Sequence, residues 1–324
     1  MRVAAGPMTR TIYAPDQPPS FLARWASRIA IFCAVILPIT AFLHRLFNLS
    51  TPVALNLALA CFAGAALVLV MAAIAGLDIW VTGRQGAARI VVATVVASAI
   101  LALPASLYVA SRKFPMLNDV TTDIADPPSL ADAAKRRQPG ANPTDYPAAR
   151  FSTLQQSSYP DLKTLTVPRP AEETFELVLQ AIAKLKMRAT YEVPPDEEPG
   201  APGIVEITDK TMVLGFVDDV VIRIASDDLQ SRVDVRSASR YGRSDFGRNA
   251  ERVRAILREI TGRLEASVPN PEAAARAQKK KDAKAAAAKR PRAGDPATAE
   301  RPSKQGPSRS GARREPARKA SPQE

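Results

Sequence analysis

The chain has 324 residues, with 44 Lys and Arg against 32 Asp and Glu, and a net charge of +12. The charge is uneven, because residues 269–324 hold 15 basic and 6 acidic residues and no large apolar side chain. This mosaic excludes a single soluble globule. A disulfide scaffold and a Cys/His metal site are also excluded, since Cys33 and Cys61 lie in apolar runs and His44 is the only histidine.

Three apolar stretches near the N-terminus predict membrane-spanning helices. About 20 apolar residues with a rise of 1.5 Å each cross the hydrocarbon core of a bilayer. The stretches extend over about 26–47, 53–77 and 89–111. The first stretch can also be interpreted as a cleaved signal peptide, but no small-residue cleavage site follows Leu43, which favours an uncleaved anchor.

The composition of these spans favours a packed anchor over a transport path. Ionisable side chains, which usually mark such paths, are absent from the span interiors. Small residues four apart, such as Ala93 and Ala97, allow helix backbones to approach closely. We therefore expect the three helices to pack against each other.

The orientation follows from the basic residues that flank the spans. If the N-terminus is cytoplasmic, five arginines lie on the inner side and three basic residues on the outer side. Three spans then place the rest of the chain outside the cytoplasm. The sequence thus predicts a multi-pass protein of a bacterial-type inner membrane with a periplasmic soluble domain, although the Lys135–Arg137 run favours the opposite orientation.

The rest of the chain divides by composition. Seven prolines between 115 and 160, with few large apolar residues, are typical of an extended linker. The basic tail has nothing to bury and should not pack. The predicted organisation is a cytoplasmic N-terminus at 1–25, three spanning helices within 26–111, a Pro-rich linker at 112–158, a folded α+β domain at 159–266, and a disordered Ala/Lys/Arg/Pro-rich tail at 267–324.

Periodicity in the soluble part predicts the order strand, helix, four strands, helix. Apolar residues from Phe175 to Leu185 follow helical spacing, and 204–208 and 212–217 are further apolar segments. The alternating runs 219–225 and 231–239 should form a hairpin. The result is an antiparallel sheet covered by helices.

The register of that hairpin can be predicted as well. Both apolar sets lie on one sheet face only if even positions of the first strand pair with odd positions of the second. Residue numbers then sum to 457, which puts Arg223 opposite Asp234. In the last helix, beginning near Ser244-Asp245, we expect Arg248 and Arg252 on the exposed face.

The segment between this hairpin and the last helix is a candidate anion-binding corner. Helix N-termini attract anions, and arginine forks match carboxylate or phosphate. The alternative is a plain connection in which Asp245 caps the helix and pairs with Arg240 or Arg243. The candidate residues are Arg236, Ser237, Ser239, Arg240, Arg243 and Ser244.

An enzyme is not expected. The soluble domain has no His or Cys, so nucleophile–base pairs of the Ser–His or Cys–His type are missing. Carboxylates could hold a hard metal ion, but Asp218 and Asp219 are adjacent in a strand and should point to opposite faces. We predict no catalytic residue, no metal and no cofactor.

Several segments together resemble the domain-of-unknown-function 1499 family. They are YPDL at 159–162, IVEI at 204–207, GFVDDVVIRI at 215–224 and VDVRSASRYGRSDFGRNAERVRAIL at 233–257. The resemblance implies a small envelope domain attached to a membrane, and it implies no activity. Its signature includes all the corner residues except Arg243, together with Asp218, Asp219, Arg223, Asp245 and Asn249; Asp234 joins them as the predicted partner of Arg223.

The expected function is therefore a non-enzymatic binding or scaffolding module at the cell envelope. One alternative is a domain that binds an anionic ligand or lipid at the arginine-rich corner. A second is a cytoplasm-facing tether that binds a polyanion or nucleic acid through the basic tail. The expected partners are the membrane itself and an anionic lipid or envelope polymer; nucleic acid is not favoured, because the tail has no aromatic residue. The oligomeric state is not predicted.

Overall fold

A computed structural model describes residues 18–195, 201–227 and 229–267, together with single positions at 271, 275, 278, 279 and 282. Most of the predicted N-terminal segment 1–25 and nearly all of the predicted tail 267–324 lie outside these residues.

Three long helices begin the described chain: α1 (Phe21–Leu46), α2 (Thr51–Thr82) and α3 (Ala87–Ser111). Each is long and apolar enough to cross a membrane, as predicted. All three pack against each other, and small side chains fill their common core, with Ala93 and Ala97 fully buried. Large apolar side chains such as Leu59, Leu67 and Leu77 face outward. An exposed apolar surface of this kind suits contact with lipid.

One antiparallel sheet organises the rest of the chain. Its strands follow the spatial order β1-β6-β5-β4-β3, and β2 pairs with β6 next to β1, along the same edge. The strands are β1 (Asp119–Thr121), β2 (Leu165–Val167), β3 (Ala189–Val193), β4 (Gly203–Lys210), β5 (Val217–Asp227) and β6 (Gln230–Ser239).

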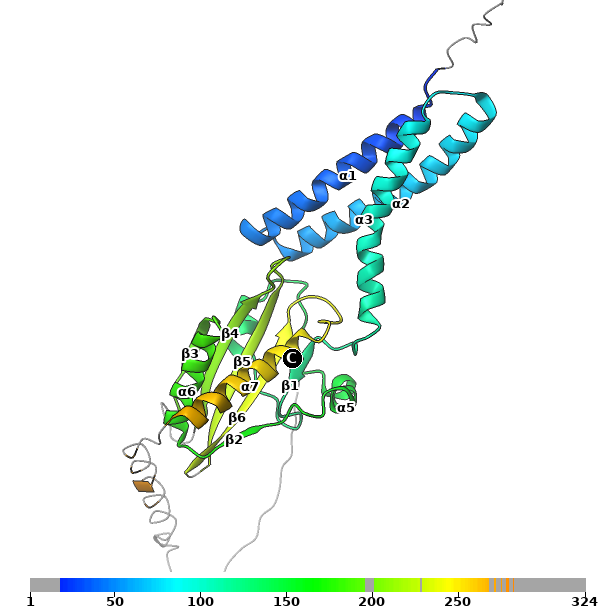
Figure 1. The fold of residues 1–324 in the computed structure, drawn as a ribbon. Coiled ribbons are helices and arrows are strands. Elements are labelled where there is room, and N and C mark those ends of the chain that lie inside the picture. Colours follow the sequence, from blue (N-terminus) through cyan, green and yellow to red (C-terminus); the bar gives the residue numbers. More distant parts are fainter. Residues whose placement is uncertain are drawn as a thin grey trace, which may run out of the picture. The chain divides into compact units, whose positions relative to one another are not determined.

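Two helices cover one face of the sheet and form the main core with it. α6 (Ala171–Lys184) and α7 (Arg248–Ala266) pack against each other and against the central strands, and Figure 1 shows α7 lying across the sheet. The core contains Val178 and Val253 from the helices and Ile222 and Val235 from the sheet. From β2 onward, the order strand, helix, four strands, helix agrees with the prediction.

The register of the β5–β6 hairpin is also as predicted. Val220 pairs with Ser237, Ile222 with Val235, and Arg223 with Asp234, so each pair of residue numbers sums to 457. The Arg223 guanidinium donates to the Asp234 carboxylate over 3.0 Å. The apolar segment 212–217, unlike the other apolar segments, is not mainly a strand, because its first residues form an exposed turn between β4 and β5.

The prediction of an extended linker at 112–158 is wrong for most of that segment. It contributes β1, α4 (Ala131–Arg136) and α5 (Ala148–Ser158) to the folded unit. Leu117, Val120 and Phe151 join the main core, while Leu130 and Ala133 pack on the second sheet face. The prolines separate short structural elements here, and the few apolar residues between them are divided between the main core and the second sheet face.

Candidate functional site

The connection from β6 to α7 is built around the carboxylate of Asp245. Asp245 accepts hydrogen bonds from the backbone N–H groups of Gly247 at 2.9 Å and Asn249 at 2.7 Å, which satisfies the start of α7. Burial raises the pKa of this carboxyl, although the two backbone donors oppose the rise. Gly247 has a φ of 78°, and a Cβ there would lie 3.1 Å from the Phe114 ring. The capping part of the plain-connection interpretation therefore describes this corner, but the pairing with Arg240 or Arg243 does not occur.

Two of the three candidate arginines are bound to carboxylates within the protein. Arg236 is only 2% exposed and donates to both Asp119 oxygens, at 3.0 and 2.7 Å. Arg240 contacts both oxygens of Asp219, with the shortest distance 2.7 Å. Arg243 is exposed and makes no side-chain ion pair with the described residues. An anion would have to displace two buried carboxylates to use all three guanidinium groups, so anion binding by the whole set stays a prediction that this geometry does not favour.

Ser237 and Asn249 belong to a second buried network, centred on Arg252. Arg252 donates to Asp218 and Asp209 and to the Ser237 hydroxyl and Asn249. Burial disfavours its charge, but these two carboxylates outweigh burial and raise its pKa. The prediction that Arg252 lies on the exposed face of α7 is wrong, because carboxylates at one end of the sheet draw its side chain inward.

The other candidate hydroxyls lie at the edges of these networks. The Ser239 hydroxyl accepts a hydrogen bond from the Asn249 side chain at 3.0 Å, and the Ser244 hydroxyl makes a long contact of 3.4 Å with the Pro115 carbonyl. The predicted placement of Asp218 and Asp219 on opposite faces is confirmed, since their arginine partners, Arg252 and Arg240, belong to different networks.

Several residues important for this architecture were not singled out from the sequence. Asp119 holds Arg236, and Arg137 donates to Asp219 at 2.9 Å. Glu206 accepts from the first backbone N–H groups of α4, at 2.9 and 2.7 Å, and burial raises its pKa. Asp119 and Arg137 lie in the supposed linker. For Glu206, the single acidic residue in the apolar run IVEI was the available signal.

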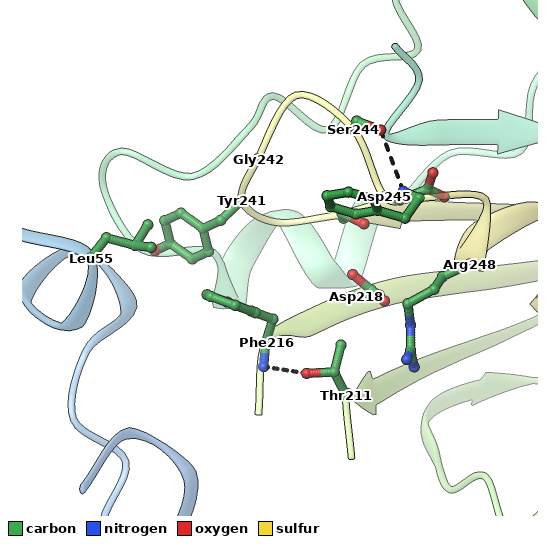
Figure 2. Close-up of a pocket in the computed structure, with 11 residues that line it drawn as sticks. Leu55, Thr211, Phe216, Asp218, Tyr241, Gly242, Ser244, Asp245 and Arg248 are labelled. Atoms are coloured by element: carbon green, nitrogen blue, oxygen red, sulfur yellow. Dashed lines mark hydrogen bonds between the residues drawn. The ribbon is translucent and has the colours of Figure 1, made fainter. Parts of the chain in front are cut away.

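A cavity of about 230 Å³ opens beside the β6–α7 connection. Its walls come from α2, from the β4–β5 turn, from the start of β5 and from the segment 239–248 (Figure 2). The apolar part consists of Leu55, Phe216 and Phe246, and the polar part includes Asp218, Tyr241 and Arg248.

Most of the charged side chains around this cavity already make contacts within the protein. Asp218 is paired with Arg252, and Asp245 receives the backbone donors of α7. Arg248, by contrast, is exposed and makes no side-chain ion pair with the described residues. The cavity therefore combines an apolar wall, hydroxyl groups and one arginine that makes no ion pair with the described residues.

Comparison with known proteins finds a family match in the part of the chain that follows the three long helices. Residues 119–260 match the model of the family described as "Protein of unknown function (DUF1499)". The resemblance seen in the sequence is thereby confirmed, and the match begins at β1, inside the segment predicted to be a linker. A search of curated proteins gave no match. A solved structure, the crystal structure of TTHA0849 from Thermus thermophilus, is similar at 12% identity and a TM-score of 0.19, over 32% of this chain and 94% of that one.

Proposed function

We propose that this protein is a membrane-anchored, non-enzymatic binding module of the cell envelope. We further propose that its cavity takes the headgroup end of an amphiphile with an anionic group. The observation that carries this proposal is the composition of the cavity wall, in which Leu55 from a span-capable helix meets polar groups of the DUF1499 domain. Such a wall matches a ligand that has an apolar and a polar end.

The chemistry of the ligand follows from the available groups. An acyl chain or similar apolar part would lie against Leu55, Phe216 and Phe246. The polar end would reach Tyr241 and Arg248, where a guanidinium fork can donate two hydrogen bonds to a phosphate or carboxylate. This proposal uses Arg248 in place of the buried Arg236 and Arg240.

Site-specific crosslinking tests the proposal. Full-length protein with the photoreactive amino acid p-benzoylphenylalanine in place of Phe246, a lining residue whose aromatic ring this probe retains, would be placed in nanodiscs of phosphatidylcholine with a minor fraction of phosphatidylglycerol. We expect phosphatidylglycerol to be crosslinked beyond its share of the disc, and Arg248→Ala to reduce this enrichment about tenfold, the range of one charge-assisted hydrogen bond.

The matched control is Arg258→Ala, because Arg258 is an exposed arginine further along the same helix. It should leave the enrichment unchanged. Equal crosslinking of the two lipids in the wild type, or equal effects of the two variants, would refute an anionic ligand at this cavity.

We also propose the topology that places the domain outside the cytoplasm, in the inner membrane. It is supported by the excess of flanking arginines on the N-terminal side. The competing tether, in which the basic tail binds a polyanion, needs the opposite topology. Fusions after residue 266 separate the two: activity of alkaline phosphatase supports the envelope location, whereas fluorescence of a cytoplasm-only reporter supports the tether.

A further inference from the structure

The turn between β4 and β5, residues 211–216, presents large apolar side chains away from the protein. Met212 is 82% exposed and Val213 is 81% exposed. Both strands of this hairpin are otherwise embedded in the sheet, so the apolar tip is not explained by packing within the domain.

The tip has a defined conformation. The Thr211 N–H donates to the Phe216 carbonyl at 2.8 Å, and the Gly215 N–H donates to the Thr211 carbonyl at 3.0 Å. The Thr211 hydroxyl also accepts from the Phe216 N–H at 2.9 Å. A turn closed by these three bonds holds the exposed side chains of Met212 and Val213 in a fixed place.

Contacts with the C-terminal end of α1 determine the position of the tip. His44 contacts the Leu214 carbonyl at 2.6 Å, and Arg45 donates to the Met212 carbonyl at 3.1 Å. The approach is close, since a Cβ on Gly215 would lie 3.0 Å from the Arg45 side chain, and Gly215 also has a φ of 76°. His44 and Arg45 belong to the last turn of a helix that can span a membrane, so the tip lies at the level where such a helix leaves the hydrocarbon.

We infer that Met212 and Val213 insert into the headgroup–acyl boundary of the leaflet reached by the C-terminal end of α1. The occupant of this apolar surface is bilayer lipid. Lys210 and Arg45 flank the tip, and long basic side chains at this depth direct their charges toward lipid headgroups. The inference rests on α1–α3 spanning a membrane and is independent of the ligand proposed for the cavity. Because Thr211 and Phe216 of the same turn also line that cavity, the insertion would bring its wall to the membrane surface.

Nitroxide labels on the full-length protein in nanodiscs test this inference. Cys33 and Cys61 are first replaced by alanine, and single cysteines are introduced by Val213→Cys, Leu229→Cys or Leu67→Cys. Leu229 is the matched control, because it is an apolar residue, 45% exposed, in the β5–β6 turn at the opposite end of β5 (Figure 1). Leu67 on α2, 54% exposed, is the reference for the membrane interior.

The readout is the collision rate of each label with oxygen, which concentrates in lipid, against that with a water-soluble nickel chelate. We expect the labels at 213 and 67 to favour oxygen and the label at 229 to favour nickel. If 67 favours oxygen while 213 behaves like 229, the insertion is wrong although the helices span. If 67 itself favours nickel, the spanning assumption fails and the inference falls with it. Dipolar broadening between labels at 213 would show that a second copy covers the tip, which also overturns lipid as the occupant.

Discussion

The buried Arg236–Asp119 pair allows the sharpest test of how the second sheet face is held together. Arg236 extends from β6 and is among the largest fully buried side chains of the described residues. It donates to both Asp119 oxygens and to the carbonyl groups of Pro128 at 3.0 Å and Thr144 at 2.6 Å. One side chain thus ties β1 and two segments after it to the sheet. We expect Arg236→Met to be among the most damaging single changes in the domain.

The expected loss of stability follows from the groups that remain buried after the substitution. Methionine fills much of the volume, but Asp119 keeps a buried carboxylate that has lost its ion-pair partner and both guanidinium hydrogen bonds. Breaking a buried pair by removing one partner costs about 3–5 kcal/mol. Since domains have total stabilities of about 5–15 kcal/mol, this is a large share. The cost of Arg236→Met together with Asp119→Asn should be smaller than that of Arg236→Met alone, because no buried charge is then left unpaired.

Amide hydrogen exchange by mass spectrometry on the full-length protein in detergent is the suitable assay, because the only tryptophans, Trp25 and Trp80, lie in α1 and α2. Protection of the β5 and β6 amides should fall by roughly two to four orders of magnitude in Arg236→Met, while α2 is unaffected. Arg258→Met makes the same chemical change on the exposed side of α7 and should alter protection little. If the two variants lose similar protection, or if the double variant is worse than Arg236→Met, the pair does not hold this face.

Two further predictions concern other ion pairs. Arg137→Ala should lower the protection of the β5 amides by the equivalent of about 1–3 kcal/mol, because Asp219 loses one of its two arginines. Lys135→Ala, which changes a highly exposed neighbour, should have no effect. If β5 were equally protected in the two variants, the linker interpretation of this segment would be restored. Arg254 donates to both oxygens of Asp161 and holds the pKa of that carboxyl below its ordinary 3.8. A carboxyl whose pKa is lowered in the folded state contributes stability above pH 3.8, and this contribution is lost as the pH falls further. Asp161→Asn should therefore cost less than about 1 kcal/mol of stability at neutral pH. In acid, the melting temperature of this variant should converge with that of the wild type. A difference that stayed constant into acid would contradict this origin.

Periodicity and register were predictable because they depend on local patterns. The spacing of apolar residues predicted α6 and α7, and the requirement for one buried face predicted the pairing of Arg223 with Asp234. The three span-capable helices follow from length and composition alone.

The partners of the arginines could not be predicted in the same way. Asp119 and Arg236 are separated by 117 positions, and no local pattern relates them. The segment around Asp119 and Arg137 also has the proline content of a linker, because short elements that cover a sheet face need few apolar residues when ion pairs hold them in place. Arg252 was misassigned for a related reason: helical periodicity locates a side chain on the helix surface, but carboxylates from β4 and β5 decide that this surface is buried.

The two faces of the sheet are thus covered through different kinds of contact, and this difference indicates which residues are available to bind a ligand. The α6–α7 face is mainly apolar, whereas on the other face Arg223, Arg236 and Arg240 are each paired with a carboxylate of a neighbouring strand. Arginines and carboxylates so deeply engaged in structure are poor candidates for ligand binding, because any ligand must first replace a buried partner. By contrast, Arg248 beside the cavity makes no ion pair with a described side chain. The side chains of the tip residues Met212 and Val213, beside the end of α1, are exposed. Variation of these positions should therefore change binding and membrane contact with little cost in stability, whereas variation of the buried arginines should do the reverse.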